Sequence, residues 1–323
     1  MKTIHVKEPG GPEKMELVEV PKPQAGPGQA LVRLAAIGVN FIDVYFRMGR
    51  YKADPPIVLG NEGAGTVESV GPGVTEVAPG DRVAWAMQRG SYAEYTVVPG
   101  ALLVKIPPHV SFETAAAAML QGMTAHYLTH STFALKAGDI CLVHAAAGGA
   151  GGLVVQMAKM LGARVFGTVS TEEKARIARE AGADETILYT EQDFEAEVKR
   201  LTSGRGVDVV YDSVGQTTFA KSLDSLRPRG MLALFGNSSG PVPPFDPNIL
   251  NGKGSLFLTR PSLGHYLLSR EELLWRAGYV LQWIDAGKLR LRMERAYPLA
   301  EAAVSHRDLE SRRTAGKLLL IPQ

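Results

Sequence analysis

The sequence predicts an α/β protein in which a barrel-like all-β region is joined to a doubly wound parallel sheet of six strands. Three observations support this prediction. Short strand patterns broken by glycine and proline fill the chain to about residue 120. Strand, turn and helix patterns then alternate from residue 138 to about residue 263, and a mixed pattern follows. At 323 residues the chain is long enough for two packed domains.

Composition indicates an ordinary globular enzyme, because 45% of the residues are hydrophobic and 21% are charged. The net charge of +2 is too small to indicate a nucleic-acid or membrane surface. The single cysteine, Cys141, excludes an intrachain disulfide and a multi-cysteine metal site. We find no signal peptide and no window of about 18 uncharged apolar residues. We therefore expect a cytoplasmic protein with no membrane partner and no nucleic-acid partner.

The all-β region is predicted from strand patterns at residues 29–37, 63–70, 81–85 and 92–98. Glycine and proline clusters such as Gly26-Pro-Gly28 separate these patterns. Evenly spaced short strands of this kind are typical of a compact barrel. An alanine-rich stretch at 115–126 predicts a helix that leads out of the region.

The parallel sheet is predicted from six apolar stretches that alternate with helical patterns, which implies right-handed crossovers and helices on both faces. The predicted strands are 140–144, 164–169, 186–189, 207–211, 231–235 and 255–259, and the predicted helices are 153–161, 172–181, 194–201 and 219–226. A helix at 271–286 and a strand at 317–321 follow. We expect this tail to return to the first domain, which makes the parallel sheet an insertion.

A glycine-rich turn, His144-Ala-Ala-Ala-Gly-Gly-Ala-Gly-Gly152, follows the first of these strands and opens a helix. It fits the dinucleotide fingerprint as Ala146-x-Gly148-x-x-Gly151, with alanine in the first glycine slot. Gly148 would let the backbone approach a pyrophosphate, and Gly151 would let helix and strand pack closely. The amides that open the helix, including those of Gly149 and Ala150, would hold the negative charge. The alternative, a structural turn without a ligand, is disfavoured by the strand–turn–helix context.

The choice between NAD and NADP depends on the residues after the second strand, Ser170-Thr-Glu-Glu-Lys174. An NAD site usually offers a carboxylate there. We interpret Ser170-x-x-Glu173 as a capping box, which gives Glu173 a local role and leaves Ser170 and Lys174 to face a 2′-phosphate. The sequence therefore predicts NADPH, although a solvated Lys174 is the commoner fate of lysine. Tyr189, at the end of the third strand, is predicted either to lie near the adenosine or to cap the sheet.

The stretch Gly60-Asn-Glu-Gly-Ala-Gly65, with Gly71-x-Gly73 and Gly80-Asp-Arg-Val83 after it, resembles the medium-chain dehydrogenases/reductases. In the zinc alcohol dehydrogenases of that superfamily, a histidine ligand occupies the position of Asn61 and a cysteine ligand lies near Asn40. Amide side chains are poor ligands for zinc. We therefore expect no metal.

Further segments resemble the zeta-crystallin type of NADPH:quinone oxidoreductase, in family order to Glu310-Ser-Arg312. They are Asn40-Phe-Ile-Asp-Val-Tyr45, His144-Ala-Ala-Ala-Gly-Gly149, Tyr211-Asp-Ser-Val-Gly215, Phe235-Gly-Asn-Ser-Ser-Gly240 and Thr259-Arg-Pro-Ser-Leu263. The resemblance implies a GroES-like β-barrel catalytic domain at 1–122 and 264–323. It also implies a Rossmann domain that binds NADPH at 123–263, and a homodimer formed through an edge strand of that domain.

The resemblance also implies roles for individual residues. Asn40 and Tyr45 would line the nicotinamide pocket, and Thr124 would contact the cofactor. Residues that follow strands four, five and six would converge on one crevice, because ligands bind beyond the carboxyl ends of parallel strands. These residues are Ser213, Phe235, Gly236, Asn237 and Arg260. Arg312 and Lys317 would contact the phosphates from the returning tail. The alternatives are that Asn40 holds a turn and that Arg260 pairs with a surface acid.

The predicted reaction is direct hydride transfer from nicotinamide C4 to a quinone, with Tyr45, Asn40 and Arg260 as hydrogen-bond donors to the developing oxyanion. Asp43 and Tyr51 would shape the acceptor site. One alternative is reduction of the C=C bond of an enoyl thioester or enone, although no basic run is present to hold coenzyme A. The other is a crystallin-like or RNA-binding protein with an enzyme fold, and the near-neutral charge argues against RNA.

Overall fold

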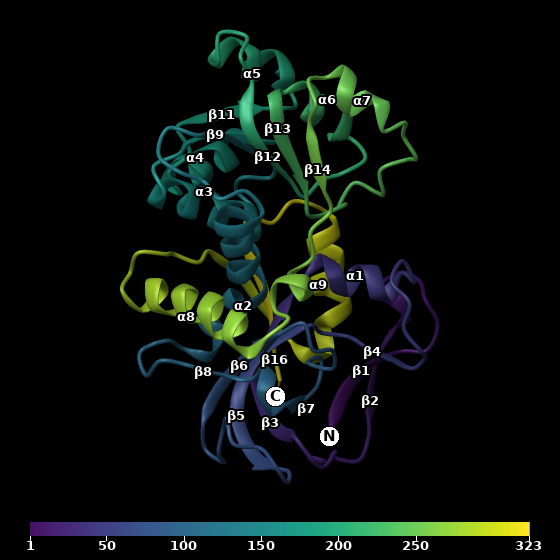
Figure 1. The fold of residues 1–323 in the computed structure, drawn as a ribbon. Coiled ribbons are helices and arrows are strands. Elements are labelled where there is room, and N and C mark those ends of the chain that lie inside the picture. Colours follow the sequence, from purple (N-terminus) through teal and green to yellow (C-terminus); the bar gives the residue numbers. More distant parts are fainter. Residues whose placement is uncertain (323) are drawn as a thin grey trace. The chain divides into compact units, whose positions relative to one another are not determined.

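A computed structural model describes residues 1–322 and divides the chain into two compact units. Unit 1 consists of Met1–Met123 and the segment from Tyr266 onward, and unit 2 is the intervening Thr124–His265. The colours of Figure 1 follow the chain from purple through unit 2 in teal and green to the yellow C-terminal segment. Within the described residues, no helix is both long enough and apolar enough to cross a bilayer.

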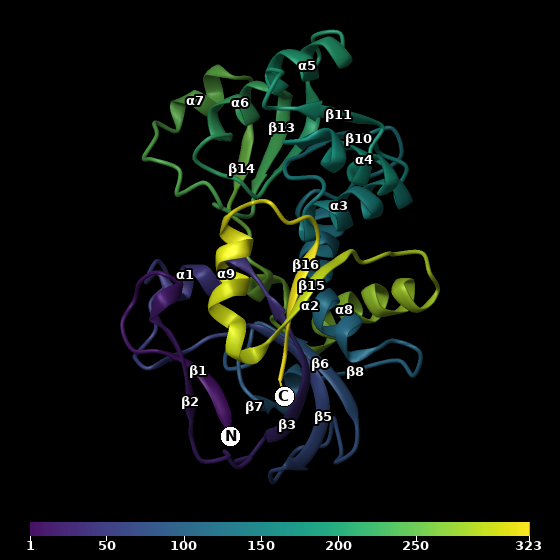
Figure 2. The ribbon, with the colours of Figure 1, turned by 180° about the vertical axis from the view of Figure 1, so that it is seen from behind.

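Unit 1 is built on a seven-stranded sheet with the order β15-β16-β3-β5-β6-β8, to which β7 adds by pairing with β3. Its pairs are antiparallel except for β15 with β16, which is parallel. The strands are β3 (Gln29–Val39), β5 (Glu62–Val70), β6 (Arg82–Ala86), β7 (Tyr95–Pro99), β8 (Val104–Lys105), β15 (Met293–Pro298) and β16 (Lys317–Ile321). Figure 2 shows yellow β16 beside β15, so the C-terminal segment completes a sheet begun by the N-terminal half.

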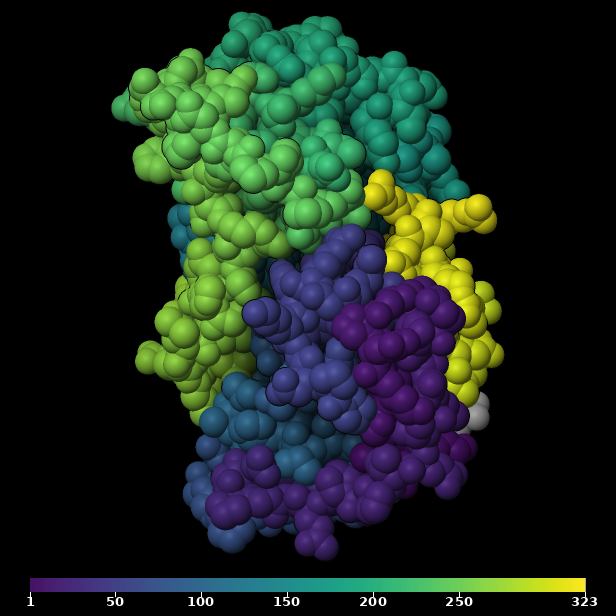
Figure 3. Space-filling view, turned by 90° about the vertical axis from the view of Figure 1, so that its right-hand side faces the viewer, coloured from purple at the N-terminus to yellow at the C-terminus, as the bar shows by residue number. Residues whose placement is uncertain are grey.

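Unit 1 also contains a smaller sheet and several helices. A three-stranded sheet has the order β2-β1-β4, with β1 at Lys2–Val6, β2 at Met15–Glu19 and β4 at Ile57–Val58. The helices are α1 (Phe41–Arg47), α2 (Phe112–Tyr127, which continues into unit 2), α8 (Arg270–Asp285) and α9 (Ala302–Glu310). Figure 3 shows the purple N-terminal segment next to the yellow C-terminal segment, and the 3-10 turn Pro12–Lys14 contacts α9.

The apolar core of unit 1 lies between its sheets and α9. Strand β3 is buried along most of its length, and Trp85 of β6 and Tyr297 of β15 are almost fully buried beside it. Burial of apolar side chains of this kind is the dominant favourable contribution to folding. The prediction of a barrel-like β region is confirmed, and α1 is a helix that the sequence patterns did not predict.

Unit 2 contains the predicted six-stranded parallel sheet, with the order β11-β10-β9-β12-β13-β14. The strands are β9 (Ile140–Val143), β10 (Arg164–Val169), β11 (Glu185–Leu188), β12 (Val207–Asp212), β13 (Leu226–Leu234) and β14 (Phe257–Thr259). The helices are α3 (Gly149–Met160), α4 (Glu172–Glu180), α5 (Phe194–Leu201), α6 (Phe219–Asp224) and α7 (Asn248–Gly252). After β9 the chain adds β10 and β11 on one side, and after β12 it adds β13 and β14 on the other side. The strand order therefore reverses between the two central strands, β9 and β12. Ligands of such sheets bind at the carboxyl ends of the strands at this switch point.

Candidate active site

The glycine-rich turn connects β9 to α3 at the centre of the unit 2 sheet. Gly148 is the N-cap of α3, with φ −76° and ψ 167°. Gly151 lies so close to the preceding turn that a Cβ there would be 2.2 Å from the carbonyl oxygen of Ala145. Ala145 itself has a φ of +52°, which an L-residue rarely adopts. The turn is therefore held tightly, and the amides of Gly149 and Ala150 at the start of α3 lack intrahelical acceptors.

A buried hydrogen-bond chain lies directly behind this turn. His144 contacts the hydroxyl of Thr168 through Nδ1 at 2.9 Å and that of Ser222 through Nε2 at 3.0 Å, and Ser222 donates to Asp212 at 2.9 Å. Because the carboxylate only accepts, Ser222 must receive its own hydrogen bond from His144 Nε2–H, and Nδ1 must accept from Thr168. Burial lowers the pKa of His144, which favours this neutral form. The chain cross-links the ends of β9, β10 and β12.

Predicted site residues at the ends of β12 and β13 are brought together. The amide of Phe235 donates to the carbonyl oxygen of Asp212 at 2.8 Å, and that of Ser238 donates to Ser213 at 3.2 Å. A Cβ on Gly236 would be 2.5 Å from the carbonyl oxygen of Ser213, so only glycine fits there. Asn237 continues this loop.

Arg260 directly follows β14 and donates from Nη1 to the carbonyl oxygen of Pro261 at 3.4 Å. It is exposed. It therefore lies at the carboxyl edge of the same sheet, as the sequence predicts.

The end of β10 differs from the prediction in one respect. Thr171, and not Ser170, is the N-cap of α4, and its hydroxyl accepts from the backbone amide of Lys174 at 3.2 Å. The predicted Ser170–Glu173 capping box is therefore wrong. Ser170 remains between the end of β10 and the cap, and its carbonyl oxygen accepts from the Thr190 hydroxyl at 3.2 Å. Serine and threonine are both good N-caps, so the local sequence alone does not decide between neighbouring positions.

Tyr189 follows β11 and is 49% exposed. Its amide donates to the carbonyl oxygen of Val169 at 3.1 Å, which places it beside the end of β10. Ser170, Lys174 and Tyr189 thus belong to one edge of the unit 2 sheet.

A buried polar cluster in unit 1 surrounds Asn40. Its Nδ2 donates to Glu62 Oε2 at 2.8 Å and to the carbonyl oxygen of Gly38 at 3.3 Å, and its Oδ1 accepts from Lys317 Nζ at 2.7 Å. Lys317 and Glu62 form an ion pair at 2.5 Å in which the side chains are 1% and 0% exposed. The amide of Leu120 also donates to Glu62, at 2.5 Å. We call Asn40, Glu62 and Lys317 the Lys317 cluster.

This cluster corrects two predictions. Lys317 is not available to a phosphate, because its ammonium is buried and already binds a carboxylate and an amide oxygen. Asn40 is not available as a donor to an oxyanion, because both of its N–H groups already have acceptors. Glu62 was not identified from the sequence. The sequence signal for Glu62 is an acid at the start of a glycine-rich stretch. The structure shows this stretch to be a strand that is buried over its first half.

Asp43 is fully buried at the start of α1 and accepts three hydrogen bonds. The donors are Asn61 Nδ2 at 2.7 Å, the amide of Asn40 at 3.0 Å and the Tyr92 hydroxyl at 3.4 Å. Burial raises the pKa of Asp43 from 3.8 to about 6, against the lowering effect of the Asn61 and Asn40 hydrogen bonds. The prediction that Asp43 shapes the acceptor site fails for direct contact, since this carboxylate has no exposed surface.

A second buried chain continues from Tyr92 to α9. His306 Nε2 lies 2.9 Å from the Tyr92 hydroxyl, and His306 Nδ1 lies 3.0 Å from Arg47 Nη1, which only donates. His306 Nδ1 therefore accepts, and the ring proton is on Nε2. Burial and the Arg47 charge lower the pKa of His306 to about 3, so the ring is neutral. Arg47 also binds Glu310 with two hydrogen bonds, at 2.8 and 2.9 Å, which ties α1 to α9.

Tyr45 and Tyr51 form an aromatic pair at the end of α1. Their ring centroids are 5.4 Å apart at an angle of 67°, and the amide of Tyr51 donates to the carbonyl oxygen of Tyr45 at 3.2 Å. The structure thus brings these two predicted residues together.

The two remaining predicted residues lie elsewhere along the chain. Thr124 is buried near the end of α2. Arg312 is exposed after α9, with a φ of +58°.

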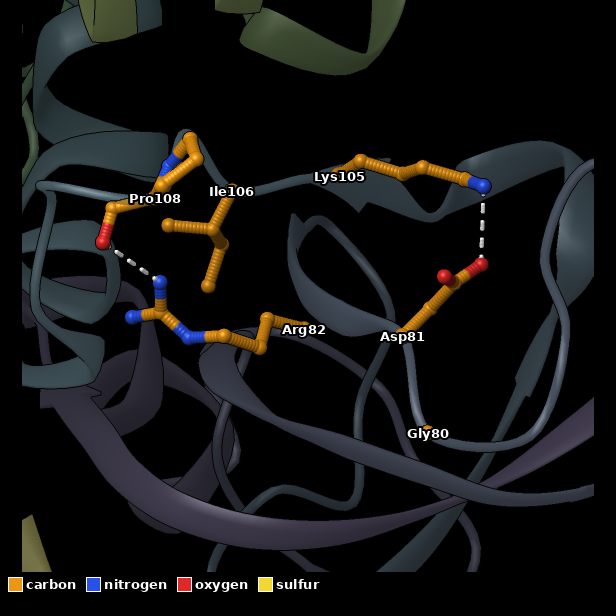
Figure 4. A pocket seen from close by; sticks show the side chains of 6 residues that line it. All are labelled: Gly80, Asp81, Arg82, Lys105, Ile106 and Pro108. Atoms are coloured by element: carbon orange, nitrogen blue, oxygen red, sulfur yellow. Dashed lines mark hydrogen bonds and ion pairs between the residues drawn. The ribbon is translucent and has the colours of Figure 1, made fainter.

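Among residues 1–322, neither a metal-binding cluster nor the surface pocket adds to these site residues. Within residues 1–322, no group of three or more histidine, cysteine, aspartate or glutamate side chains is arranged to hold a metal ion. The surface pocket in Figure 4 lies in unit 1, where Lys105 pairs with Asp81 at 2.9 Å and Arg82 donates to the carbonyl oxygen of Pro108 at 3.1 Å. It contains none of the predicted site residues.

Comparison with known proteins identifies the family. Residues 26–108 match the alcohol dehydrogenase GroES-like domain, and residues 149–272 match the zinc-binding dehydrogenase family. A quinone oxidoreductase of Pseudomonas aeruginosa is 47% identical, with 97% of each chain covered. The chain belongs to the quinone oxidoreductase family. This confirms the resemblance to zeta-crystallin type members of the medium-chain dehydrogenases/reductases.

Two other relatives are similar to this chain over nearly its full length. A 2-haloacrylate reductase of a Burkholderia species is 45% identical, covering 99% of this chain and 98% of the relative. The crystal structure of Escherichia coli quinone oxidoreductase complexed with NADPH superposes with a TM-score of 0.98 at 42% identity, and all of both chains is covered. The GroES-like and Rossmann architecture is therefore confirmed.

Proposed function

We propose that this protein is an NADPH-dependent quinone oxidoreductase that transfers hydride from nicotinamide C4 to a quinone. The observation that carries the proposal is the glycine-rich turn at the switch point of the unit 2 sheet, with Lys174 beyond the neighbouring strand. The P. aeruginosa quinone oxidoreductase and the E. coli structure with NADPH support the same assignment.

The residues of unit 2 fit a dinucleotide. The space around Gly151 admits no side chain, and the amides of Gly149 and Ala150 are in the first turn of α3, where a helix favours an anion. We assign the diphosphate to these amides, together with Ala146, Gly148 and Gly151. We assign the 2′-phosphate and adenosine to Ser170, Lys174 and Tyr189, with Arg312 as a further phosphate contact. When bound, NADPH supplies the hydride.

On the acceptor side, Tyr45 and Arg260 remain the proposed donors to the developing oxyanion, and Tyr51 is proposed to contact the acceptor. Thr124, Ser213, Phe235, Gly236 and Asn237 remain proposed cofactor contacts. The role of Asn40 changes from donor to support, because the Lys317 cluster uses its amide.

A second candidate is reduction of an activated C=C bond, which the 45% identity to a 2-haloacrylate reductase favours. The test is NADPH oxidation by the purified protein with a naphthoquinone and, separately, with 2-chloroacrylate. Turnover of the quinone at a higher kcat/KM supports our proposal. Preferential turnover of the haloacrylate would replace it with the second candidate, and no turnover of either with NADPH bound would contradict both.

We further propose a catalytic domain at 1–122 and 264–323, an NADPH-binding domain at 123–263, and a cytoplasmic homodimer. The sole cysteine, Cys141, is buried, and burial raises the pKa of its thiol. A buried, protonated thiol is compatible with a reducing compartment. Strand β14 supports the homodimer, because it is an edge strand with Phe257 57% exposed.

A further inference from the structure

Gln121 carries a buried oxygen that the protein does not satisfy. It lies on α2, and among residues 1–322 its Oε1 has no hydrogen-bond partner although it is shielded from solvent. Buried carbonyl oxygens are nearly always paired with a donor, so each exception needs an explanation. A bound ligand that carries a donor is one such explanation.

The orientation of the Gln121 amide is fixed by the Lys317 cluster. Asn40 directs its oxygen toward Lys317 and its nitrogen toward Glu62, so an acceptor is what it presents to Gln121. Gln121 Nε2 lies 3.5 Å from that oxygen. Rotating the Gln121 amide by half a turn would oppose two oxygens, which is unfavourable. The unpaired atom is therefore an acceptor, and it is the amide atom that does not contact the Lys317 cluster.

The position of Gln121 on α2 links it to the proposed cofactor site. Gln121 and Thr124 are three residues apart in one continuous helix, and such residues lie on the same face. Thr124 is a proposed cofactor contact. The unpaired oxygen thus lies one turn before a residue already assigned to the cofactor.

We propose that Gln121 contacts the cofactor, with its Oε1 accepting a hydrogen bond from the carboxamide N–H of the reduced nicotinamide. This inference rests on the proposed function. Among the ligands of that function, a quinone carries only acceptor oxygens and cannot pair with Oε1. The nicotinamide carboxamide carries two N–H donors and can. Gln121 would then fix the rotation of the carboxamide, with Lys317, Glu62 and Asn40 as positioning residues behind it.

The test combines a protein variant with a cofactor analogue. Gln121→Met keeps the length of the side chain and removes its acceptor. The reduced 3-acetylpyridine analogue of NADPH replaces the carboxamide NH₂ with a methyl group. We expect either change alone to weaken binding about 3- to 10-fold, the range of one neutral hydrogen bond. Combining them should weaken binding little further, because both remove the same contact.

Two variants control this experiment. Gln121→Glu loses the hydrogen bond from Nε2 to Asn40, which affects both dissociation constants alike, but it keeps an acceptor and should retain the preference for NADPH over the analogue. Glu113→Met, at an exposed position on the first turn of α2, should leave both dissociation constants unchanged. Multiplicative losses from Gln121→Met and the analogue, or no loss from Gln121→Met, would overturn the inference while NADPH binding itself stands. No binding of NADPH by the wild type would instead contradict the proposed function.

Discussion

Lys174 is the single residue on which the proposed cofactor selectivity depends. Its backbone amide is bonded to the Thr171 cap, which fixes the start of α4, and its side chain follows the end of β10. A lysine at this edge favours a phosphate, whereas an NAD site usually offers a carboxylate there. Although Thr171 and not Ser170 is the N-cap, Lys174 still lies in the first turn of α4, after the end of β10.

We predict that Lys174→Ala weakens NADPH binding by about tenfold or more, the scale of a charge-assisted hydrogen bond. NADH lacks the 2′-phosphate, so its dissociation constant should change less than twofold, as measured by fluorescence titration of both cofactors. Lys199→Ala, an exposed lysine on α5, is the matched control. Equal losses for NADPH and NADH would remove the reason for choosing NADPH.

Asp43 is a second residue with a measurable consequence. Its pKa is raised in the folded protein from 3.8 to about 6, so between these pH values the folded state binds a proton that the unfolded state has released. Its contribution to stability is therefore lost as the pH rises from about 4 to 6 and stays lost above that. At about 1.36 kcal/mol per pKa unit, the effect is about 3 kcal/mol at neutral pH.

We predict that Asp43→Asn removes this pH dependence. The free energy of unfolding of the variant minus that of the wild type should become more positive by about 2 to 3 kcal/mol between pH 4 and pH 7. Urea denaturation at each pH measures it, and the loss of cap hydrogen bonds adds only a constant offset. A difference that stays flat over this range would show that the pKa of Asp43 is not raised.

At the scale of elements, the start of α3 is the most constrained position in unit 2. We predict that Gly151→Ala lowers the free energy of unfolding by about 1 to 3 kcal/mol and weakens NADPH binding, because the new Cβ forces α3 away from Ala145. Gly152→Ala is the matched control. Its Cβ would meet nothing closer than 3.5 Å, so we expect a gain of up to about 1 kcal/mol from helix propensity. Thermal unfolding and NADPH titration of both variants give the comparison, and similar behaviour of the two would contradict the steric argument.

The elements of unit 2 could be predicted from the sequence because each has its own local pattern. The strand predicted at 164–169 and the helix predicted at 194–201 match β10 and α5 to the residue.

In unit 1, helix α1 was missed because it is only seven residues long and contains Ile42 and Val44, which favour strands. Strand β15 was missed because all but its last two residues are exposed, so it lacks an apolar pattern.

The candidate site was less predictable in unit 1 than in unit 2. The glycine-rich turn is a local motif, but the Lys317 cluster joins residues as far as 277 positions apart. The sequence shows Lys317 only as a lysine that opens an apolar strand. Whether it faces a phosphate or a buried carboxylate depends on the pairing of β16 with β3, which no local pattern specifies.

At the scale of the whole molecule, the exposed edge of the unit 2 sheet predicts self-association. We predict that the protein sediments as a dimer and that Phe257→Lys raises the dimer dissociation constant about 30-fold, corresponding to about 2 kcal/mol. Met160→Lys, which changes an exposed apolar residue of α3, should leave it unchanged. Analytical ultracentrifugation measures both variants. A monomeric wild type would contradict the prediction.

The sheet of unit 1 draws its strands from both ends of the chain, and this arrangement sets an order on biosynthesis. β3 and β5 leave the ribosome early, yet β16, which pairs with β3, is made after every other described strand. Until it arrives, Glu62 has no lysine to neutralise it and the growing sheet keeps an open edge. Unit 2 is complete by His265 and needs no later strand for its own sheet. We therefore expect it to mature during translation while unit 1 waits for β16.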